Sequence, residues 1–280
     1  MERTVLERQR VSLTTASAAA DVVIEIGGCP IRLSTDDPAF VEMLKERYAG
    51  FVTSGTNARI AFDVMLAPAD TMLGTGDVRV ERESGQWSIG RGDFQADWNP
   101  RAARGIIRQS VNPYSINSVL RIVHTLLLAE QGGFLVHASS AVRNGRAFLF
   151  AGVSGAGKTT MARLAPPDVT LLTDEISYVS RQEDGYHAYG TPFAGDLGRL
   201  GENMRAPLEA LYLLRKGTEN KVEPVGAAEA SRALLENILC FANDSEVVRS
   251  VFEAACDFVC RVPIRRLTFV PDARVWEMIE

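Results

Sequence analysis

The chain has 280 residues, of which 46% are hydrophobic and 23% are charged, and its formal net charge is −5. This composition is typical of a globular protein with one large or two modest domains. The acidic balance argues against nucleic acid as a partner, because such binding relies on Lys and Arg to neutralise phosphates.

The chain carries no sign of export, membrane insertion or a cysteine-bound metal. Its opening residues, MERTVLERQR, are not followed by an apolar run, so we expect no signal peptide. The most apolar stretch, 115–131, contains Arg121 and His124 and is too short to span a bilayer comfortably, so we expect no membrane partner. No C-x-x-C pair occurs, and Cys256 and Cys260, four apart on an expected helix, are predicted to be buried. We therefore expect a cytoplasmic protein with reduced thiols.

Residues 1–132 predict a small α+β module to which we assign no chemistry. The polar, alanine-rich residues 1–20 are expected to be frayed. Residues 21–33 form two apolar runs around a Gly-Gly pair, which predicts a hairpin. A helix is expected over 37–50, because an Asp-Pro pair begins it and a glycine ends it. Further strands are expected over 58–66, 77–82, 86–90 and 93–98, with Trp87 and Trp98 as packing residues.

Residues 133–280 predict a second, α/β domain. It follows a helix expected over 112–131, which an Asn-Pro pair begins and a Gly-Gly pair ends. Strands over 134–141 and 147–151 are expected to pair through an Asn-Gly turn. No low-complexity linker separates the two parts, so we expect them to pack against each other.

The stretch 148–160, FLFAGVSGAGKTT, fits the P-loop pattern G-x-x-x-x-G-K-[ST] between an apolar strand and a helix. The backbone N–H groups of such a loop cradle phosphate oxygens. Lys158 can reach the β- and γ-phosphates, where it would act in catalysis, and Thr159 can ligate magnesium. The expected nucleotide-binding residues are Gly152, Ser154, Gly155, Ala156, Gly157, Lys158, Thr159 and Thr160. The sequence therefore predicts binding of ATP with Mg²⁺.

Two carboxylates, Asp174 and Glu175, follow a strand expected over 169–173, soon after Lys158. We expect this strand to return beside the P-loop strand, which would bring both acids near the γ-phosphate. One carboxylate can then hold magnesium, and the other can accept a proton from an attacking hydroxyl.

His137 lies on the strand that precedes the Asn-Gly turn. Antiparallel pairing through that turn predicts that His137 lies close to Asp174. A lone histidine on an apolar strand is also commonly a satisfied core residue, so both interpretations stay open.

Together, His137, the P-loop and the acid pair resemble the catalytic domain of HPr kinase/phosphorylase, a serine kinase whose fold is related to phosphoenolpyruvate carboxykinase. In that family a histidine precedes a G-x-x-G-x-G-K-[ST] loop, and an Asp-Asp pair follows on the next strand. The resemblance covers about residues 137–179. It implies a P-loop kinase domain with Asp174 as the base for the substrate hydroxyl, Glu175 as a magnesium ligand beside Thr159, and His137 as their supporting partner.

The chain departs from that family at Glu175, where the family has a second aspartate, and over 189–211, YGTPFAGDLGRLGENMRAPLEAL. This segment is similar to a variant branch that includes lasso-peptide kinases. The expected acceptor is therefore a hydroxyl in a peptide or protein rather than HPr. We expect the segment to be a lid or substrate loop, in which Arg199 or Arg205 could neutralise transferred charge.

The last third of the chain is predicted to form structural elements that support the site and take no part in its chemistry. Its expected elements are strands over 208–214, 220–222 and 261–270, helices over 227–241 and 245–258, and a closing helix from 271. Leu234, Leu235, Ile238 and Leu239 are expected to form one buried helix face.

Two other functions are compatible with these residues. One is a nucleotide-binding regulatory or scaffold protein that transfers no phosphate. The other is a small-molecule kinase of carboxykinase type, for which Arg199, Arg205 and Lys221 are scattered too widely in sequence to decide. A homo-oligomeric state is also compatible with the sequence.

Overall fold

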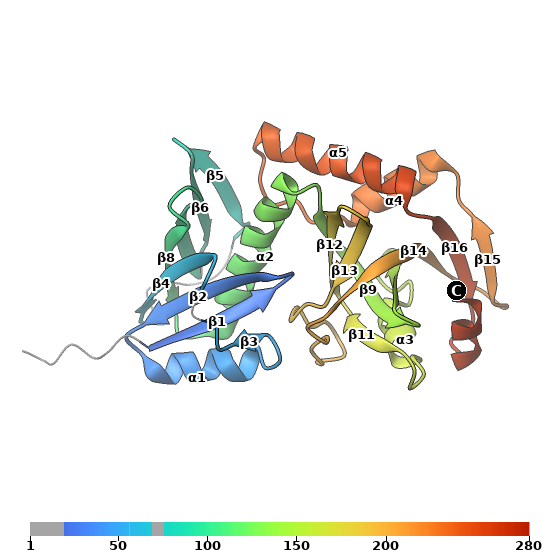
Figure 1. Cartoon of the computed structure of the whole chain (residues 1–280), viewed down its shortest axis with the longest axis horizontal. Helices are drawn as coiled ribbons and strands as arrows, with labels where there is room; N and C mark the ends of the chain where they lie inside the picture. Colours follow the sequence, from blue (N-terminus) through green and yellow to red (C-terminus); the bar gives the residue numbers. More distant parts are fainter. Residues whose placement is uncertain (1–19, 56, 69–75, 280) are drawn as a thin grey trace, which may run out of the picture.

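The computed structural model describes residues 20–55, 57–68 and 76–279. It is a mixed α/β structure with two eight-stranded sheets, one from each part of the chain (Figure 1). Helix α2 (Pro113–Glu130) lies between the strands of the two sheets. The opening stretch that we expect to be frayed and without a signal peptide lies outside the described residues, apart from Ala20, which begins the first strand.

The first sheet has the strand order β3-β1-β2-β4-β8-β7-β6-β5. Its strands are β1 (Ala20–Ile26), β2 (Cys29–Thr35), β3 (Val52–Thr53), β4 (Ile60–Ala67), β5 (Arg79–Glu83), β6 (Gln86–Arg91), β7 (Phe94–Asn99) and β8 (Arg104–Ser110). The predicted hairpin is β1–β2, and the predicted meander is β5–β6–β7. Strands β3 and β8 have no counterpart among the predicted elements.

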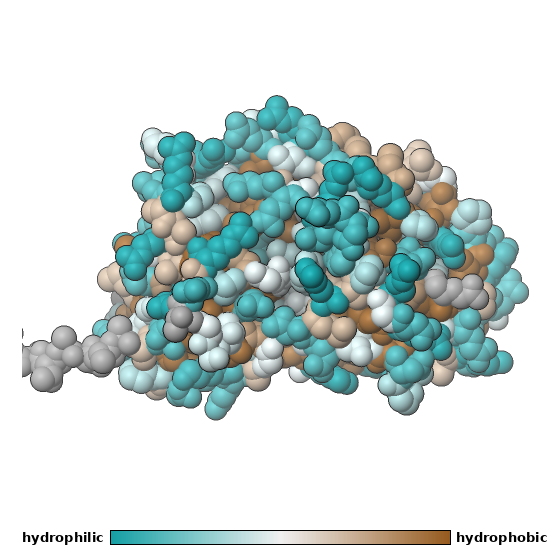
Figure 2. Space-filling view, in the orientation of Figure 1, coloured by the Kyte–Doolittle hydropathy of each residue, from teal (hydrophilic) through white to brown (hydrophobic). Residues whose placement is uncertain are grey.

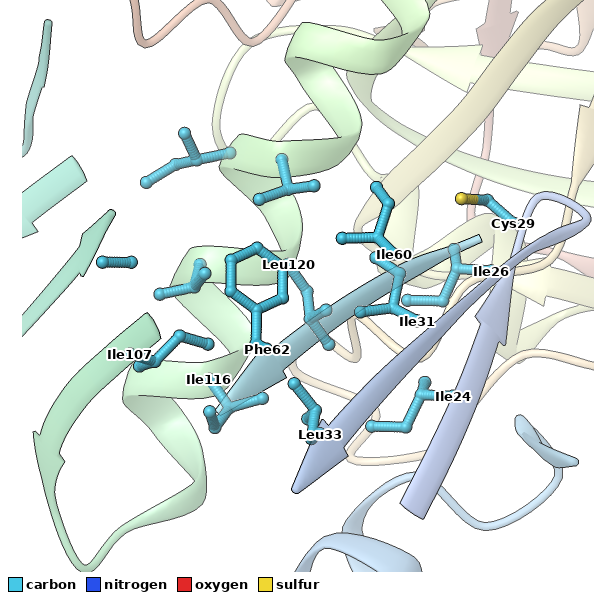
Figure 3. Packing of buried hydrophobic residues seen from close by; sticks show 14 of the residues in the cluster. Ile24, Ile26, Cys29, Ile31, Leu33, Ile60, Phe62, Ile107, Ile116 and Leu120 are labelled. Atoms are coloured by element: carbon cyan, nitrogen blue, oxygen red, sulfur yellow. The ribbon is translucent and has the colours of Figure 1, made fainter. Parts of the chain in front are cut away.

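Alternating apolar residues on these strands bury one face of the first sheet. Figure 3 shows Phe62 and Ile107 of the sheet beside Ile116 and Leu120 of α2. Helix α1 (Pro38–Arg47) also covers the sheet, and its expected cap is confirmed because the Asp37 side chain accepts backbone N–H groups of the first turn. The predicted packing role of the two tryptophans is confirmed, since Trp87 and Trp98 are buried and lie opposite each other on β6 and β7.

The second sheet has the strand order β10-β9-β12-β13-β14-β16-β15, with β11 paired to β9 and an additional pairing of β10 with β14. Its strands are β9 (Phe134–Arg143), β10 (Arg146–Ala151), β11 (Thr170–Thr173), β12 (Ile176–Gln182), β13 (Gly185–Tyr189), β14 (Arg205–Lys216), β15 (Lys221–Pro224) and β16 (Ile264–Phe269). The predicted Asn144-Gly145 turn joins β9 to β10 with both residues at positive φ. Strands β12 and β13 have no counterpart among the predicted elements.

The expectation that residues 169–173 return beside the P-loop strand is wrong. Strand β11 pairs with β9, which lies between β11 and the P-loop strand β10. The tight turn pairs one edge of β10 with β9, and the other edge of β10 pairs in parallel with β14. Since β10 has no free edge, the returning chain adds to β9 instead.

The helices of the second part are α3 (Lys158–Arg163), α4 (Ala227–Asn237) and α5 (Ser245–Arg261), with a 3-10 helix η2 (Ala273–Met278) at the end. The closing helix is therefore 3-10 rather than α. The prediction that Cys256 and Cys260 are buried is also wrong, because both lie exposed on α5.

Helix α4 is shorter than predicted. The chain leaves it at Ile238, which bridges to Val136 of β9, while the next residue donates its N–H to the Leu135 carbonyl. Of the three leucines and one isoleucine expected on one buried helix face, Leu234 is fully buried, whereas Leu235 is 37% exposed. The backbone pairing with β9 outweighs continuation of the helical pattern.

The two parts share a hydrophobic core, as expected from the missing linker. The core of the first sheet includes Ile176, Tyr178 and Phe193 from the second part. The Gly27 backbone lies directly on the Tyr178 ring, and the His124 ring of α2 meets the same tyrosine edge-on at a centroid distance of 5.6 Å. Helix α5 runs across the top of both parts and packs against α2 (Figure 1).

Hydrophilic side chains cover much of the face shown in Figure 2, with smaller apolar areas between them. Within the described ranges, no helix is both long and apolar enough to cross a membrane.

Replacing Gly27 by Ala is expected to destabilise the protein more than replacing its neighbour Gly28. Both glycines are in the left-handed region, so either alanine costs about 1–2 kcal/mol. A Cβ on Gly27 would lie 2.3 Å from Tyr178 Cζ, whereas nothing lies within 4 Å of one on Gly28. Overpacking therefore adds about 1–3 kcal/mol for Gly27→Ala alone. Thermal unfolding of the two variants measures this difference. Equal losses of stability would show that the β1–β2 hairpin is not closely packed against Tyr178 of β12.

Acidification is expected to destabilise the protein partly through His124. Burial lowers the pKa of His124 to about 3, and neither ring nitrogen has a hydrogen-bond partner among the described residues. The unfolded chain binds this proton near the ordinary pKa of 6.5, so stability falls as the pH drops from there toward 3. In His124→Leu, the free energy of unfolding should depend less steeply on pH, by up to about 1.4 kcal/mol per unit. Denaturant titrations across that interval check this, and parallel pH profiles would contradict it.

Candidate functional site

The P-loop connects the end of β10 to the start of α3, as its strand–loop–helix pattern predicts. Gly155 and Gly157 have φ values of +76° and +116°, which L side chains rarely adopt. A Cβ on Gly157 would also lie 2.5 Å from the Phe269 ring of β16. Lys158 folds back over the loop and donates from Nζ to the Gly152 carbonyl at 3.0 Å. The loop geometry therefore depends on glycine at Gly157, where the pattern requires it, and also at Gly155, where the pattern allows any residue.

Neighbouring elements hold the helix end of this loop. The Ser139 hydroxyl on β9 donates to the Lys158 carbonyl at 3.2 Å. The Trp276 indole on η2 donates to the Met161 carbonyl, also at 3.2 Å. Strand β9 and the C-terminal segment thus fix α3 from two sides.

The acid pair lies at the bend between β11 and β12, both of which pair with β9. The Thr173 hydroxyl stabilises the bend by accepting the backbone N–H groups of Glu175 and Ile176. Ile176 lies opposite His137 in the β9–β12 register. This register brings His137 Nε2 within 3.3 Å of Glu175 Oε1. The histidine thus contacts the acid pair through Glu175, and not through Asp174 as the turn pairing suggested.

Asp174 lies beneath the segment 190–204, which joins β13 to β14. Its side chain accepts the Gly195 N–H on one carboxylate oxygen at 2.8 Å and the Leu197 N–H on the other at 2.9 Å. The residue is only 3% exposed. A Cβ on Gly195 would lie 2.6 Å from Glu175 Oε2, so glycine allows this close approach. The segment therefore closes directly over the acid pair.

The P-loop and Glu175 line one open pocket of about 450 Å³. Its lining residues are His137, Ser154, Gly155, Gly157, Lys158, Thr159, Thr160, Glu175, Asp196 and Lys216. Of the predicted site residues, Gly152, Ala156 and Asp174 do not line it. Gly152 binds the lysine from the strand end, and Ala156 is buried behind the loop.

Two lining residues, Asp196 and Lys216, are absent from the sequence prediction. Asp196 belongs to the segment expected to be a lid, so its acidic side chain was a detectable signal. Lys216 ends β14 two residues beyond the predicted strand end at 214, and no motif marks it.

The arginines expected to neutralise transferred charge do not line this pocket. Arg199 lines a separate hollow together with Arg163 and Leu197. Arg205 begins β14 and lies opposite Tyr189 of β13.

The charges in the pocket influence one another. Burial lowers the pKa of Lys158, and the Glu175 carboxylate opposes this shift. Burial also lowers the pKa of His137, with the Lys158 charge adding to the effect and Glu175 opposing it. His137 is therefore neutral at neutral pH, and the Glu175 carboxylate acts electrostatically on both His137 and Lys158.

The oxygen atoms of Thr159 and Glu175 are suitable ligands for Mg²⁺, a hard cation commonly bound by one or two protein oxygens plus phosphates. No cluster of three or more His, Cys, Asp or Glu side chains that could hold a metal occurs in the described part of the chain. A magnesium site here would thus depend on phosphate oxygens of a nucleotide.

Comparison with known proteins identifies one family. No curated protein matches the chain. The family model described as SynChlorMet cassette protein ScmC matches residues 106–280, which run from within β8 through α2 and the whole second sheet. The match covers more than half of the chain, and the chain therefore belongs to the ScmC family.

Proposed function

We propose that this chain is an ATP-dependent kinase that transfers the γ-phosphoryl group to a hydroxyl, a serine above all, in a peptide or protein. The observation that carries the proposal is one pocket lined by the P-loop residues Lys158 and Thr159 and by Glu175 with its partner His137. A P-loop serves many nucleotide-dependent functions, but a carboxylate beside the γ-phosphate position suits phosphoryl transfer. The fold would be of the HPr kinase type that the sequence motifs resemble.

Each residue of the pocket has a distinct role in this proposal. The loop N–H groups and Lys158 bind the phosphates, and Thr159 and Glu175 hold magnesium. Bound magnesium would neutralise charge on the β- and γ-phosphates. Neutral His137 orients the Glu175 carboxylate from 3.3 Å. Asp174 is the proposed base, as the resemblance to HPr kinase/phosphorylase implies.

For Asp174 to accept a proton, Gly195 and Leu197 must first release its carboxylate. A base has to come within hydrogen-bond reach of the acceptor hydroxyl, and both Asp174 oxygens are engaged by backbone N–H groups. We therefore propose that the segment 190–204 moves when the acceptor binds. Its closure over the acids would also limit transfer of the phosphoryl group to water.

The same observation favours a second candidate function. A buried carboxylate bound by two backbone N–H groups could serve only to hold the segment 190–204 in place. The chain would then be a nucleotide-binding regulatory or scaffold protein whose segment opens and closes without transfer. Labelled ATP separates the two functions, because only a kinase passes the label to a hydroxyl.

Lys158→Met is expected to abolish transfer of label from γ-labelled ATP to a panel of serine-containing peptides. Loss of one charge-assisted contact to the phosphates should also weaken ATP binding by about 10–100-fold. Lys221→Met, at an exposed lysine paired with Glu223, is the matched control and should behave as wild type. ATP binding by the wild-type protein without labelled product, across the panel, would favour the regulatory function instead.

Asp174→Asn and Glu175→Gln are expected to reduce transfer for different reasons. Loss of a general base costs about 10²–10⁴-fold in rate, so Asp174→Asn should lower kcat while ATP affinity stays near wild type. Glu175→Gln removes a magnesium ligand and should raise the Mg²⁺ concentration needed for half-maximal rate. Rates measured across a Mg²⁺ titration test both. Undiminished transfer by Asp174→Asn, alongside inactive Lys158→Met, would show that Asp174 is not the base.

A further inference from the structure

One arginine near the acid pair comes from the first part of the chain. Arg121 lies on α2, the helix that covers the first sheet, and shares one helix face with Asn117 and His124. This face is turned toward the second part, since His124 meets Tyr178 of β12. The Arg121 guanidinium lies 5.2 Å from the centre of the Phe193 ring, which belongs to the segment 190–204.

Among the described residues, no carboxylate lies within ion-pair distance of the Arg121 guanidinium. Its Nε atom is buried without a hydrogen-bond partner, and no ion pair joins it to any described residue. Burial lowers the pKa of Arg121, with Glu175 as the main opposing charge. An arginine nevertheless keeps its charge, and a largely desolvated, unpaired charge is costly to the fold. The arrangement suggests that an anion absent from the protein chain itself completes it.

The position of Arg121 indicates where this anion would sit. Phe193, which is fully buried and holds the guanidinium, precedes Gly195, the glycine that contacts both acids. Arg121 is not among the residues that line the pocket in this structure. Its contact with Phe193 joins it to the segment 190–204, whose Gly195 contacts both acids and which the proposed function already requires to move.

We propose that Arg121 binds the phosphoryl group during its transfer, so that α2 of the first part completes the site of the second. This inference rests on the proposed kinase function. In the transfer, the bond between the γ-phosphorus and the β,γ-bridging oxygen breaks, and a bond to the acceptor oxygen forms. ADP is the leaving group, and the hydroxyl proton passes to the base. Arg121 forms no covalent bond and stabilises the charge of the group in transit.

A planar phosphoryl mimic tests this role directly. Binding of ADP with Mg²⁺ should tighten at least about tenfold when aluminium fluoride is added to the wild-type protein. Arg121→Met should bind ADP alone within about twofold of wild type but lose the tightening. Arg121→Lys keeps the charge and the aliphatic stem, and should retain part of it. Arg232→Met, at an exposed arginine on α4, is the control for loss of one positive charge and should keep the tightening in full.

The remaining outcomes each decide between explanations. Thermal unfolding identifies a misfolded Arg121→Met, in which case Arg121→Lys carries the test. A folded Arg121→Met that keeps the tightening overturns the inference and leaves the proposed kinase intact. If a folded Arg121→Met keeps the tightening and also shows a raised KM for the acceptor peptide, Arg121 recognises charge on the acceptor and the phosphoryl assignment is wrong. If the wild-type protein binds ADP without any tightening, the kinase proposal fails together with the inference.

Discussion

The candidate site depends on the pairing of strand β9 along both of its edges. One edge pairs with the P-loop strand β10, and the other pairs with β11 and β12. The acid pair lies at the bend between those two strands, so β9 sets its distance from the P-loop. The register of β9 with β12 also places His137 against Glu175. A slip of one residue in that register would turn His137 to the opposite face of the sheet and separate the pair.

Helix α2 ties the first sheet to this site. It buries Ile116 and Leu120 against the first sheet and directs His124 and Arg121 toward the second. The ScmC family match begins shortly before α2 and continues through the second sheet. The matched segment therefore contains both α2 and the second sheet. The domain boundary expected from the sequence, after residue 132, would assign α2 and the second sheet to different domains.

Local sequence signals predicted much of the fold and part of the site. The Asp37 cap, the Asn144-Gly145 turn and the strand–loop–helix arrangement around the glycine-rich loop each depend on residues adjacent in the chain, and all three are confirmed. Features that depend on long-range pairing were missed or misplaced. Strand β11 joins β9 because β10 has no free edge, and α4 ends early because Ile238 pairs with β9.

The same limit applies within the site. The sequence indicated that a histidine and two acids lie together, but it placed the histidine beside Asp174, whereas His137 contacts Glu175. That choice follows from the bend after Thr173 and from the backbone N–H groups of Gly195 and Leu197, which bind Asp174. The pocket residue Lys216 could not be predicted, because the parallel pairing of β14 with β10 and β16 brings it there.

A structure of the protein with Mg²⁺ and a non-hydrolysable ATP analogue tests the central claim most directly. The account predicts the β- and γ-phosphates on the loop N–H groups and Lys158, magnesium between Thr159 and Glu175, and the γ-phosphate facing the acid pair. Nucleotide bound outside the pocket, or bound there with its γ-phosphate turned away from Asp174 and Glu175, would contradict it.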